Sequence, residues 1–281
     1  MMANNKFVIL HCVAPVAVIL GITFIYPMVN IVLFTFRSDA ENSLVTFVID
    51  NYTEILTSKY YLSTLWNVFL LSISTSAVAV FAALPSSFYI AMNNKGATVL
   101  KALFSLNFAF GGIVYGIIII ALLGNVGIVS LIEKAIFGTS LSGGMAYTIP
   151  GLAIAYLGFQ TPRSALILAA SIEKLDTDLT KAARTLGANR FQVIWHVTLP
   201  MLKYPLLNTL SLIFCMSMSS FGVALLVARN FSIFPVEIYR EFTGFMNFNL
   251  AAAMGIILSA ITLFATYSVK KIIGKGAILY G

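Results

Sequence analysis

The residue types that carry enzyme chemistry are few in this chain, and they lie apart from one another. The only histidines, His11 and His196, have no neighbouring cysteine or cluster of acids, so we expect no metal site. Cys12 and Cys215 both lie in apolar runs, which suits packing rather than a disulfide framework. The Gly-Lys-Gly run at 274–276 lacks the rest of a phosphate-binding loop, and no serine-centred nucleophile elbow is present. We therefore expect no catalytic residue and no cofactor bound by this chain.

A polar, basic segment from Asp176 to Pro200 interrupts the apolar sequence and has the pattern of two short helices. Gly187 can end the first helix with a positive φ. Asn189 and Gln192 have the spacing of a capping box that begins the second, and Pro200 can start a further helix in its first turn. The first helix has apolar residues at i, i+3, i+4 and i+7: Leu179, Ala182, Ala183 and Leu186. The apolar face of the second contains Phe191, Ile194 and Trp195.

The same segment resembles the EAA loop of binding-protein-dependent ABC importer permeases, which reads Glu-Ala-Ala-x3-Gly-x9-Ile-x-Leu-Pro. The matching residues are Ala182, Ala183, Gly187, Val197, Leu199 and Pro200. Lys181 stands where the family usually has an acidic residue, so this chain lacks the carboxylate through which a salt bridge could form there. The resemblance implies that this loop is a coupling helix docking into an ATP-hydrolysing partner. By this resemblance the coupling residues are Lys181, Ala182, Ala183, Leu186, Gly187 and Arg190.

The composition is that of an integral membrane protein. Of 281 residues, 59% are hydrophobic and only 10% are charged, with a mean hydropathy of +0.95; soluble domains carry about 25% charged residues. Backbone groups in lipid must be paired within their own segment, so the spans are helical. We predict an all-α membrane protein with six transmembrane helices and one permease domain over 1–281. The predicted spans are about 8–36, 62–92, 99–123, 148–172, 204–228 and 249–270, with a cytoplasmic EAA coupling loop at 173–200.

The basic residues predict the orientation. Eleven of the 17 lysines and arginines lie on the side of the 173–200 loop, and five lie on the other. Because cytoplasmic loops carry the excess of positive charge, both termini and this loop are predicted to be cytoplasmic. The outer loops include an acidic segment, Arg37–Lys59, in which the Asp50–Tyr52 run reads as a turn or helix start, and a segment with a short interfacial helix at Ile128–Phe137.

Arg163 is the one charge that falls within a predicted span. If the fourth helix runs through residues 148–172, Arg163 lies near its middle, beside Pro162. Charges at that depth usually face a cavity or a partner, so Arg163 and Gln160 are proposed to line a translocation pathway. There Arg163 would contact an anionic solute or a lipid headgroup. Two alternatives stay open: the helix stops near Pro162 and Arg163 marks its cytoplasmic end, or Arg163 makes a structural pair with a backbone carbonyl or a partner permease.

The resemblance implies the type I, MetI-like permease fold, located in a bacterial inner membrane. The expected function is the import of a small polar or charged solute by alternating access. The short sequence motifs at Asp50–Tyr52 and Gly158–Pro162 are similar to motifs of the spermidine/putrescine, ferric-iron and phosphonate permease subgroup. The implied partners are two ATP-binding-cassette subunits, which hold ATP and Mg, a second permease and an extracytoplasmic solute-binding protein. No nucleic acid is expected. The alternative is an ion-coupled secondary transporter or channel, against which the absence of acids within the predicted spans counts. A purely structural scaffold leaves the capped loop unexplained.

Overall fold

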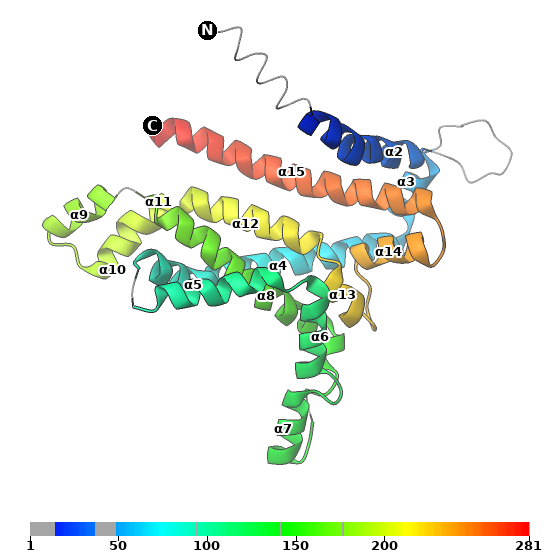
Figure 1. Ribbon diagram of the computed structural model, residues 1–281, viewed down its shortest axis with the longest axis horizontal. Coiled ribbons are helices and arrows are strands. Elements are labelled where there is room, and N and C mark those ends of the chain that lie inside the picture. Colours follow the sequence, from blue (N-terminus) through cyan, green and yellow to red (C-terminus); the bar gives the residue numbers. More distant parts are fainter. Residues whose placement is uncertain (1–14, 37–48, 94, 141, 176, 281) are drawn as a thin grey trace, which may run out of the picture. The chain divides into compact units, whose positions relative to one another are not determined.

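The computed structural model describes residues 15–36, 49–93, 95–140, 142–175 and 177–280, and every regular element among them is a helix (Figure 1). Residues 8–14 of the first predicted span, most of the predicted acidic loop and Asp176 lie outside the described residues. The chain forms two compact units. The first holds the residues up to Leu62 and Glu237–Ile257, and the second holds Ser63–Val236 and the chain from Leu258. Each unit is described by itself below.

The first unit begins with an apolar helix, Pro15–Phe34, which is long enough to span a membrane. That helix includes the π-helix η1 (Gly21–Ile25) and α2 (Tyr26–Phe34). The first unit also contains α3 (Asp50–Thr57) and parts of α4, α14 and α15, whose bounds are given below. The helix start predicted at Asp50 is confirmed by α3. The buried Thr35 attaches α3 to the end of α2, because its carbonyl accepts from Asn51 Nδ2 at 2.9 Å and its Oγ1 accepts from the Tyr52 hydroxyl at 3.0 Å.

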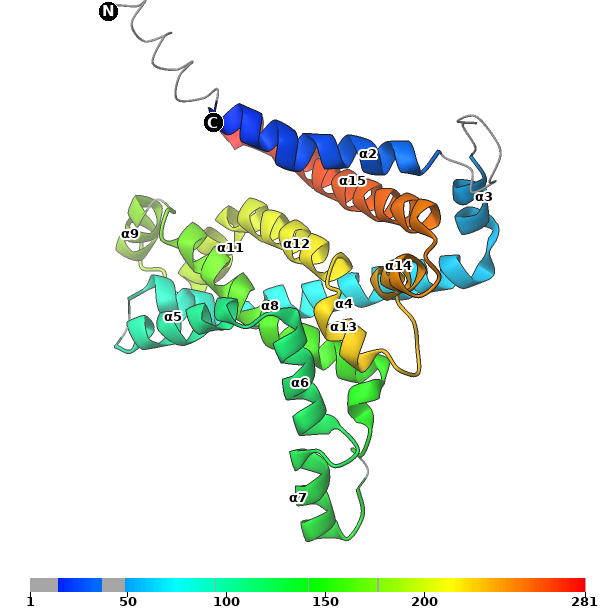
Figure 2. The same cartoon turned by 45° about the vertical axis from the view of Figure 1, so that its right-hand side comes forward.

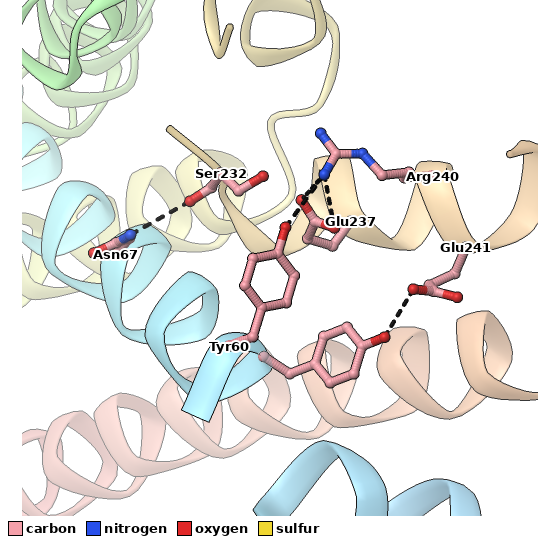
Figure 3. A network of polar contacts seen from close by, with 7 residues as sticks. Tyr60, Asn67, Ser232, Glu237, Arg240 and Glu241 are labelled. Carbon is pink, nitrogen blue, oxygen red and sulfur yellow. Dashed lines mark hydrogen bonds and ion pairs between the residues drawn. The ribbon is translucent and has the colours of Figure 1, made fainter. Parts of the chain in front are cut away.

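Two buried carboxylates of the first unit, Glu237 and Glu241, are paired with groups from the same unit (Figure 3). Arg240 Nη1 lies 3.1 Å from Glu237 Oε1 and donates to the Tyr60 hydroxyl at 3.2 Å. The Tyr61 hydroxyl donates to Glu241 Oε1 at 2.7 Å. A buried carboxylate is costly unless it is paired in this way, so these contacts bind the start of α4 to α14.

The second unit contains most of the helices. They are α5 (Ala97–Leu106), η2 (Asn107–Ala109), α6 (Gly112–Leu123), α7 (Ile128–Phe137), η3 (Met145–Tyr147), α8 (Ile149–Ile172), α9 (Thr177–Thr185), α10 (Arg190–Val193), the π-helix η4 (Ile194–Thr198), α11 (Leu199–Met201), α12 (Lys203–Met218) and α13 (Gly222–Val227). Three of the described helices are shared between the units: α4 (Lys59–Ala91), α14 (Phe234–Thr243) and α15 (Phe248–Tyr280). Its fully buried core joins three long helices: Val80 and Ala83 from α4, Ala165 and Leu168 from α8, and Ile213 from α12. A further contact, Asn67 Nδ2 to Ser232 O at 3.4 Å, ties α4 to the segment before α14 (Figure 3).

The predicted helices and the observed ones agree for α4, α7 and α8, and α7 has the predicted bounds. Helix α15 begins within one residue of the predicted sixth span but continues to Tyr280, beyond the predicted end at 270. The third and fifth predicted spans are not continuous. The third is split into α5 with η2 and then α6, and the fifth is split into α12 and α13. The breaks fall at Phe110–Gly111 and at 219–221, where the sequence contains pairs of glycines and serines that weaken a helix.

Four helices among the described residues are long and apolar enough to cross a membrane, or five if the pair joined at Leu202 and bent by 61° is one span. The 24-residue α8 is not among the four, since Gln160, Pro162 and Arg163 lower the hydropathy of its centre. The six-span count and the cytoplasmic location of the termini therefore stay predictions.

Candidate functional site

The loop at 173–200 folds as two capped helices at one end of the second unit (Figure 1). Helix α9 ends at Thr185 and is terminated by Gly187, which has φ +88°. Gly187 N–H donates to Arg184 O at 3.0 Å, and Ala188 N–H donates to Ala183 O at 3.1 Å. These two bonds are a Schellman motif, which satisfies the carbonyls at the helix end. The predicted positive φ at Gly187 is confirmed.

The second helix of the loop begins with the predicted capping box. Asn189 N–H donates to Gln192 Oε1, and Gln192 N–H donates to Asn189 Oδ1, both at 2.8 Å. Two orphan donors are thereby paired, and α10 begins at Arg190. Both helix ends of the turn are therefore held by specific hydrogen bonds.

Pro200 lies in the first turn of α11, as predicted, but α11 directly continues the π-helix η4 and is not a separate helix. Before it, Leu199 N–H donates to Ile194 O, five residues back, in the π-turn η4. In an α-helix the proline ring would clash with the carbonyl four residues back, and the wider π-turn moves that carbonyl aside. The same arrangement precedes Pro27, where Tyr26 N–H donates to Gly21 O in η1.

The loop exposes large apolar side chains. The exposed fractions are 52% for Leu179, 88% for Leu186, 72% for Phe191 and 57% for Trp195. The Phe191 and Trp195 rings stack with centroids 6.1 Å apart. Exposed apolar side chains that are concentrated in one loop indicate an interaction surface. We call these four residues the apolar set of the loop.

Four further predicted coupling residues are at least partly accessible. Ala182, Leu186 and Gly187 are exposed, and Ala183 is half-buried. Lys181 Nζ lies 2.9 Å from Asp178 Oδ1, and both side chains are mostly exposed. The lysine that replaces the usual acid thus forms an ion pair one turn back within α9. Because both groups are exposed to solvent, this ion pair contributes little to the stability of the protein.

Arg163 lies in the interior of α8, which runs unbroken from Ile149 to Ile172. The alternative in which the helix stops near Pro162 is therefore wrong. Pro162 has no N–H for the carbonyl of Gly158, four residues back. Asn107 Nδ2 supplies the missing donor at 3.3 Å and also donates to the Tyr115 hydroxyl. With its orphan carbonyl paired, α8 continues through the proline.

The Arg163 guanidinium rests on aromatic rings. Its Cζ lies 5.1 Å from the Phe108 ring centroid and 5.6 Å from that of Phe159, which is cation–π distance. Its Nη1 lies 3.9 Å from the Met216 sulfur, a weak acceptor. Among the described residues Arg163 makes no ion pair, and its buried Nε has no hydrogen-bond partner.

A cavity of about 270 Å³ opens beside Arg163, between α8 and the two helix breaks. Its lining residues are Phe110, Gly112, Tyr115, Phe159, Arg163, Met216, Ser219, Ser220, Phe221 and Gly222. Irregular backbone at membrane depth is tolerated where it lines a cavity or is buried in protein. The structure therefore places an arginine and two interrupted helices around one space.

The helix breaks are held by specific contacts. The Tyr156 hydroxyl from α8 donates to Ser220 O at 2.8 Å, so this carbonyl at the second break is paired. Helices α6 and α13 lie side by side (Figure 2). A Cβ added at Gly222 would lie 2.9 Å from Ile113 N, so only glycine allows the two backbones to approach this closely.

Gln160 is fully buried and does not line the cavity. Its Nε2 donates to Ser217 Oγ at 2.5 Å, and its Oε1 has no partner. Sequence reasoning missed Asn107, Ser219 and Ser220, for which the Gly-Gly and Ser-Ser pairs in charge-free runs were the available signal. No group of His, Cys, Asp or Glu suited to a metal ion occurs among the residues that the structure describes.

Comparison with known proteins gives relatives among transport permeases. The chain is 29% identical over 184 residues to sulfate permease 2 of the Chlamydomonas reinhardtii chloroplast, covering 63% of this chain and 47% of that protein. It is 25% identical over 264 residues to a putative ferric transport system permease, FbpB 1, of Haemophilus influenzae, and this match covers 93% of this chain and 41% of that protein. The chain thus spans about half or less of the length of these two relatives.

Solved structures show which fold the chain shares, and a family model shows its family. A bacterial ABC transporter involved in the import of alginate superposes with a TM-score of 0.72 at 16% identity, over 96% of this chain and 97% of that one. The inward-facing MetNI methionine ABC transporter superposes with a TM-score of 0.61 at 13% identity, over 77% of this chain and 95% of that one. These likenesses show the fold. Residues 83–276 match the family model, and the chain therefore belongs to the family described as the binding-protein-dependent transport system inner membrane component.

Proposed function

We propose that this chain is the permease subunit of an ATP-driven importer, which passes a small polar or charged solute into the cytoplasm by alternating access. The observation that carries the proposal is the loop at 173–200, whose spacing matches the family's coupling loop and whose apolar set is exposed. The relatives are named for ferric iron and sulfate, so the proposed solutes of this chain include small inorganic ions.

The geometry of the loop supports a docking role. An amphipathic helix that lays its apolar face into a groove is a recurrent mode of recognition. Here Leu186 and the stacked Phe191–Trp195 pair supply large apolar area. The Schellman motif and the capping box hold the turn between the two helices, so a push from a partner would be transmitted as a rigid-body movement.

The partners follow from this role. Two ATP-binding-cassette subunits would hold ATP and Mg and receive the coupling loops, and a second permease would complete the pathway. An extracytoplasmic binding protein would deliver the solute. In this arrangement the chain crosses the membrane six times, with both termini and the coupling loop in the cytoplasm. Lys181 would face the partner as a positive group where other members present a carboxylate, and Arg190 would add to that charge.

Co-purification from native membranes tests the proposal. We expect ATP-binding-cassette subunits to be retained by the wild-type chain. They should dissociate about tenfold or more readily from a Leu186→Ala/Trp195→Ala variant, since buried aromatic anchors dominate such interfaces. The matched control is Leu131→Ala in α7, where the leucine is 53% exposed but lies outside the loop. A wild-type chain that carries no such subunit, or that transports with an ion gradient and no nucleotide, would refute the proposal.

A further inference from the structure

We propose that the cavity beside Arg163 binds a small oxyanion, so that the solute of this permease is an anion rather than a polyamine or a free metal cation. The inference rests on the proposed transport function for its physiological meaning, but the site itself is argued from the geometry of the second unit.

The charge of Arg163 is the first argument. An arginine stays protonated in a protein, and an unpaired charge is costly at membrane depth. None of the ten lining residues is acidic, and the guanidinium contacts two phenylalanine rings and a methionine sulfur. The cation–π contacts offset only part of the cost. An anion in the cavity would complete the missing pairing.

The free donors of Arg163 are the second argument. Nε is buried and unpartnered, and Nη1 meets only sulfur. The planar guanidinium presents its donors as a fork that matches the oxygens of a carboxylate, phosphate or sulfate. A monatomic anion would satisfy the charge but could not accept two parallel hydrogen bonds with this geometry.

Two hydroxyls at the cavity add donors. Ser220 lines it, and within the described residues its hydroxyl makes no hydrogen bond. The Tyr115 oxygen accepts from Asn107 Nδ2, which leaves the Tyr115 proton to donate elsewhere. Arg163, Ser220 and Tyr115 therefore offer positive charge and hydrogen-bond donors, and no carboxylate is present among the lining residues to attract a cation.

The size and position of the cavity restrict the ligand. Its volume of about 270 Å³ is below the roughly 300–1,000 Å³ of pockets for drug-sized molecules. It lies where α5–α6 and α12–α13 are interrupted, and discontinuous helices at mid-membrane commonly form the ion and substrate sites of transporters. A small oxyanion with some of its water fits this space.

Protection from arginine modification tests the site directly. The assembled complex is treated with phenylglyoxal, and the modification of Arg163 is followed by peptide mass spectrometry with inorganic sulfate, inorganic phosphate or spermidine present. We expect sulfate or phosphate to slow modification by about tenfold when present at about ten times its Kd, and spermidine to have no effect. Arg229, which lies 4.9 Å over the Tyr147 ring and does not line the cavity, is the internal control.

Uptake into proteoliposomes that contain the whole transporter and its binding protein gives the second measurement. Arg163→Gln should lower anion uptake by about tenfold or more, as expected for losing hydrogen bonds to a charged group. Arg163→Lys should retain part of the uptake, because it keeps the charge and loses the fork. Arg229→Gln should transport as the wild type does.

The inference would be overturned by equal protection by spermidine, by no protection by either anion, or by wild-type anion uptake by Arg163→Gln. An Arg163 that resists phenylglyoxal with and without anion would mean that a partner carboxylate already pairs it, which also overturns the inference. The protection measurement needs no ATP hydrolysis, and the proposed function is judged by subunit co-purification, so the two proposals fail separately.

Discussion

At the scale of single residues, Asn107 links three features that are distant in sequence. It lies at the break between α5 and α6, donates to the carbonyl that Pro162 leaves unpaired in α8, and holds the hydroxyl of Tyr115 at the cavity. Unpaired backbone carbonyls are costly away from water. Asn107 therefore supports both the continuity of α8 and the position of Arg163 within it.

We expect Asn107→Ala to destabilise the protein by about 1–3 kcal/mol, the usual cost of leaving a buried polar group without its partner. Thermal unfolding of the purified protein measures this. Pro162→Ala restores an N–H to the helix, so the double variant should lose less stability than Asn107→Ala alone, a coupling that a double-mutant cycle isolates. Asn208→Ala, at an exposed asparagine in α12, is the control. Equal losses with and without Pro162 would contradict this role.

At the scale of elements, prolines and glycines decide where the helices bend, end and cross. A π-turn precedes both Pro27 and Pro200, and the glycines at 112 and 222 allow α6 and α13 to approach closely. In the coupling loop, Gly187 ends α9 at a φ that L-residues with a Cβ adopt only with strain. No atom lies within 4 Å of a Cβ added there, so the strain is conformational rather than steric.

Gly187→Val should therefore strain the end of α9 by roughly 1 kcal/mol or more and weaken the association of the ATPase subunits, while the protein still inserts in the membrane. Subunit retention and solute-stimulated hydrolysis measure the effect. Gly138→Val is a matched control, because Gly138 ends α7 at φ +72° and also has open space around it. The coupling role of Gly187 would be abandoned if both variants retained the subunits equally well.

At the scale of the whole molecule, the distribution of basic residues predicts how the chain lies in the membrane. With the predicted six spans, the side of the membrane that holds the coupling loop carries eleven lysines and arginines, and the other side carries five. Family membership places the chain in transport systems of the inner membrane.

In a chain without Cys12 and Cys215, cysteines introduced at Asn189 and Lys95 should react only with membrane-permeant reagents. A cysteine at Ser140, between α7 and η3, should react with impermeant reagents as well. All three positions are exposed, so access depends on the side of the membrane. Labelling of Asn189 from outside intact cells would reverse the orientation.

Local signals in the sequence were sufficient for the coupling loop. The glycine at 187 and the capping box at 189–192 act through hydrogen bonds between residues a few positions apart, so their pattern could be read without the fold. The same holds for α7, α3 and the apolar runs that became α4 and α15, since periodicity and hydropathy are local properties. The family resemblance, read from that loop, is confirmed by the match over residues 83–276.

Only the tertiary structure decided what happens at the centre of the second unit. Hydropathy is uniform along a charge-free run, so the third and fifth spans were predicted as continuous. The glycine and serine pairs weaken a helix but do not by themselves decide that it breaks. A stop of the fourth helix near Pro162 was left open by the sequence, yet α8 passes through the proline, because Asn107, 51 positions before Gly158, supplies the missing donor. The environment of Arg163 likewise depends on α8 and the two helix breaks meeting around one cavity. Contacts between residues so far apart in the chain leave no periodic pattern in the sequence.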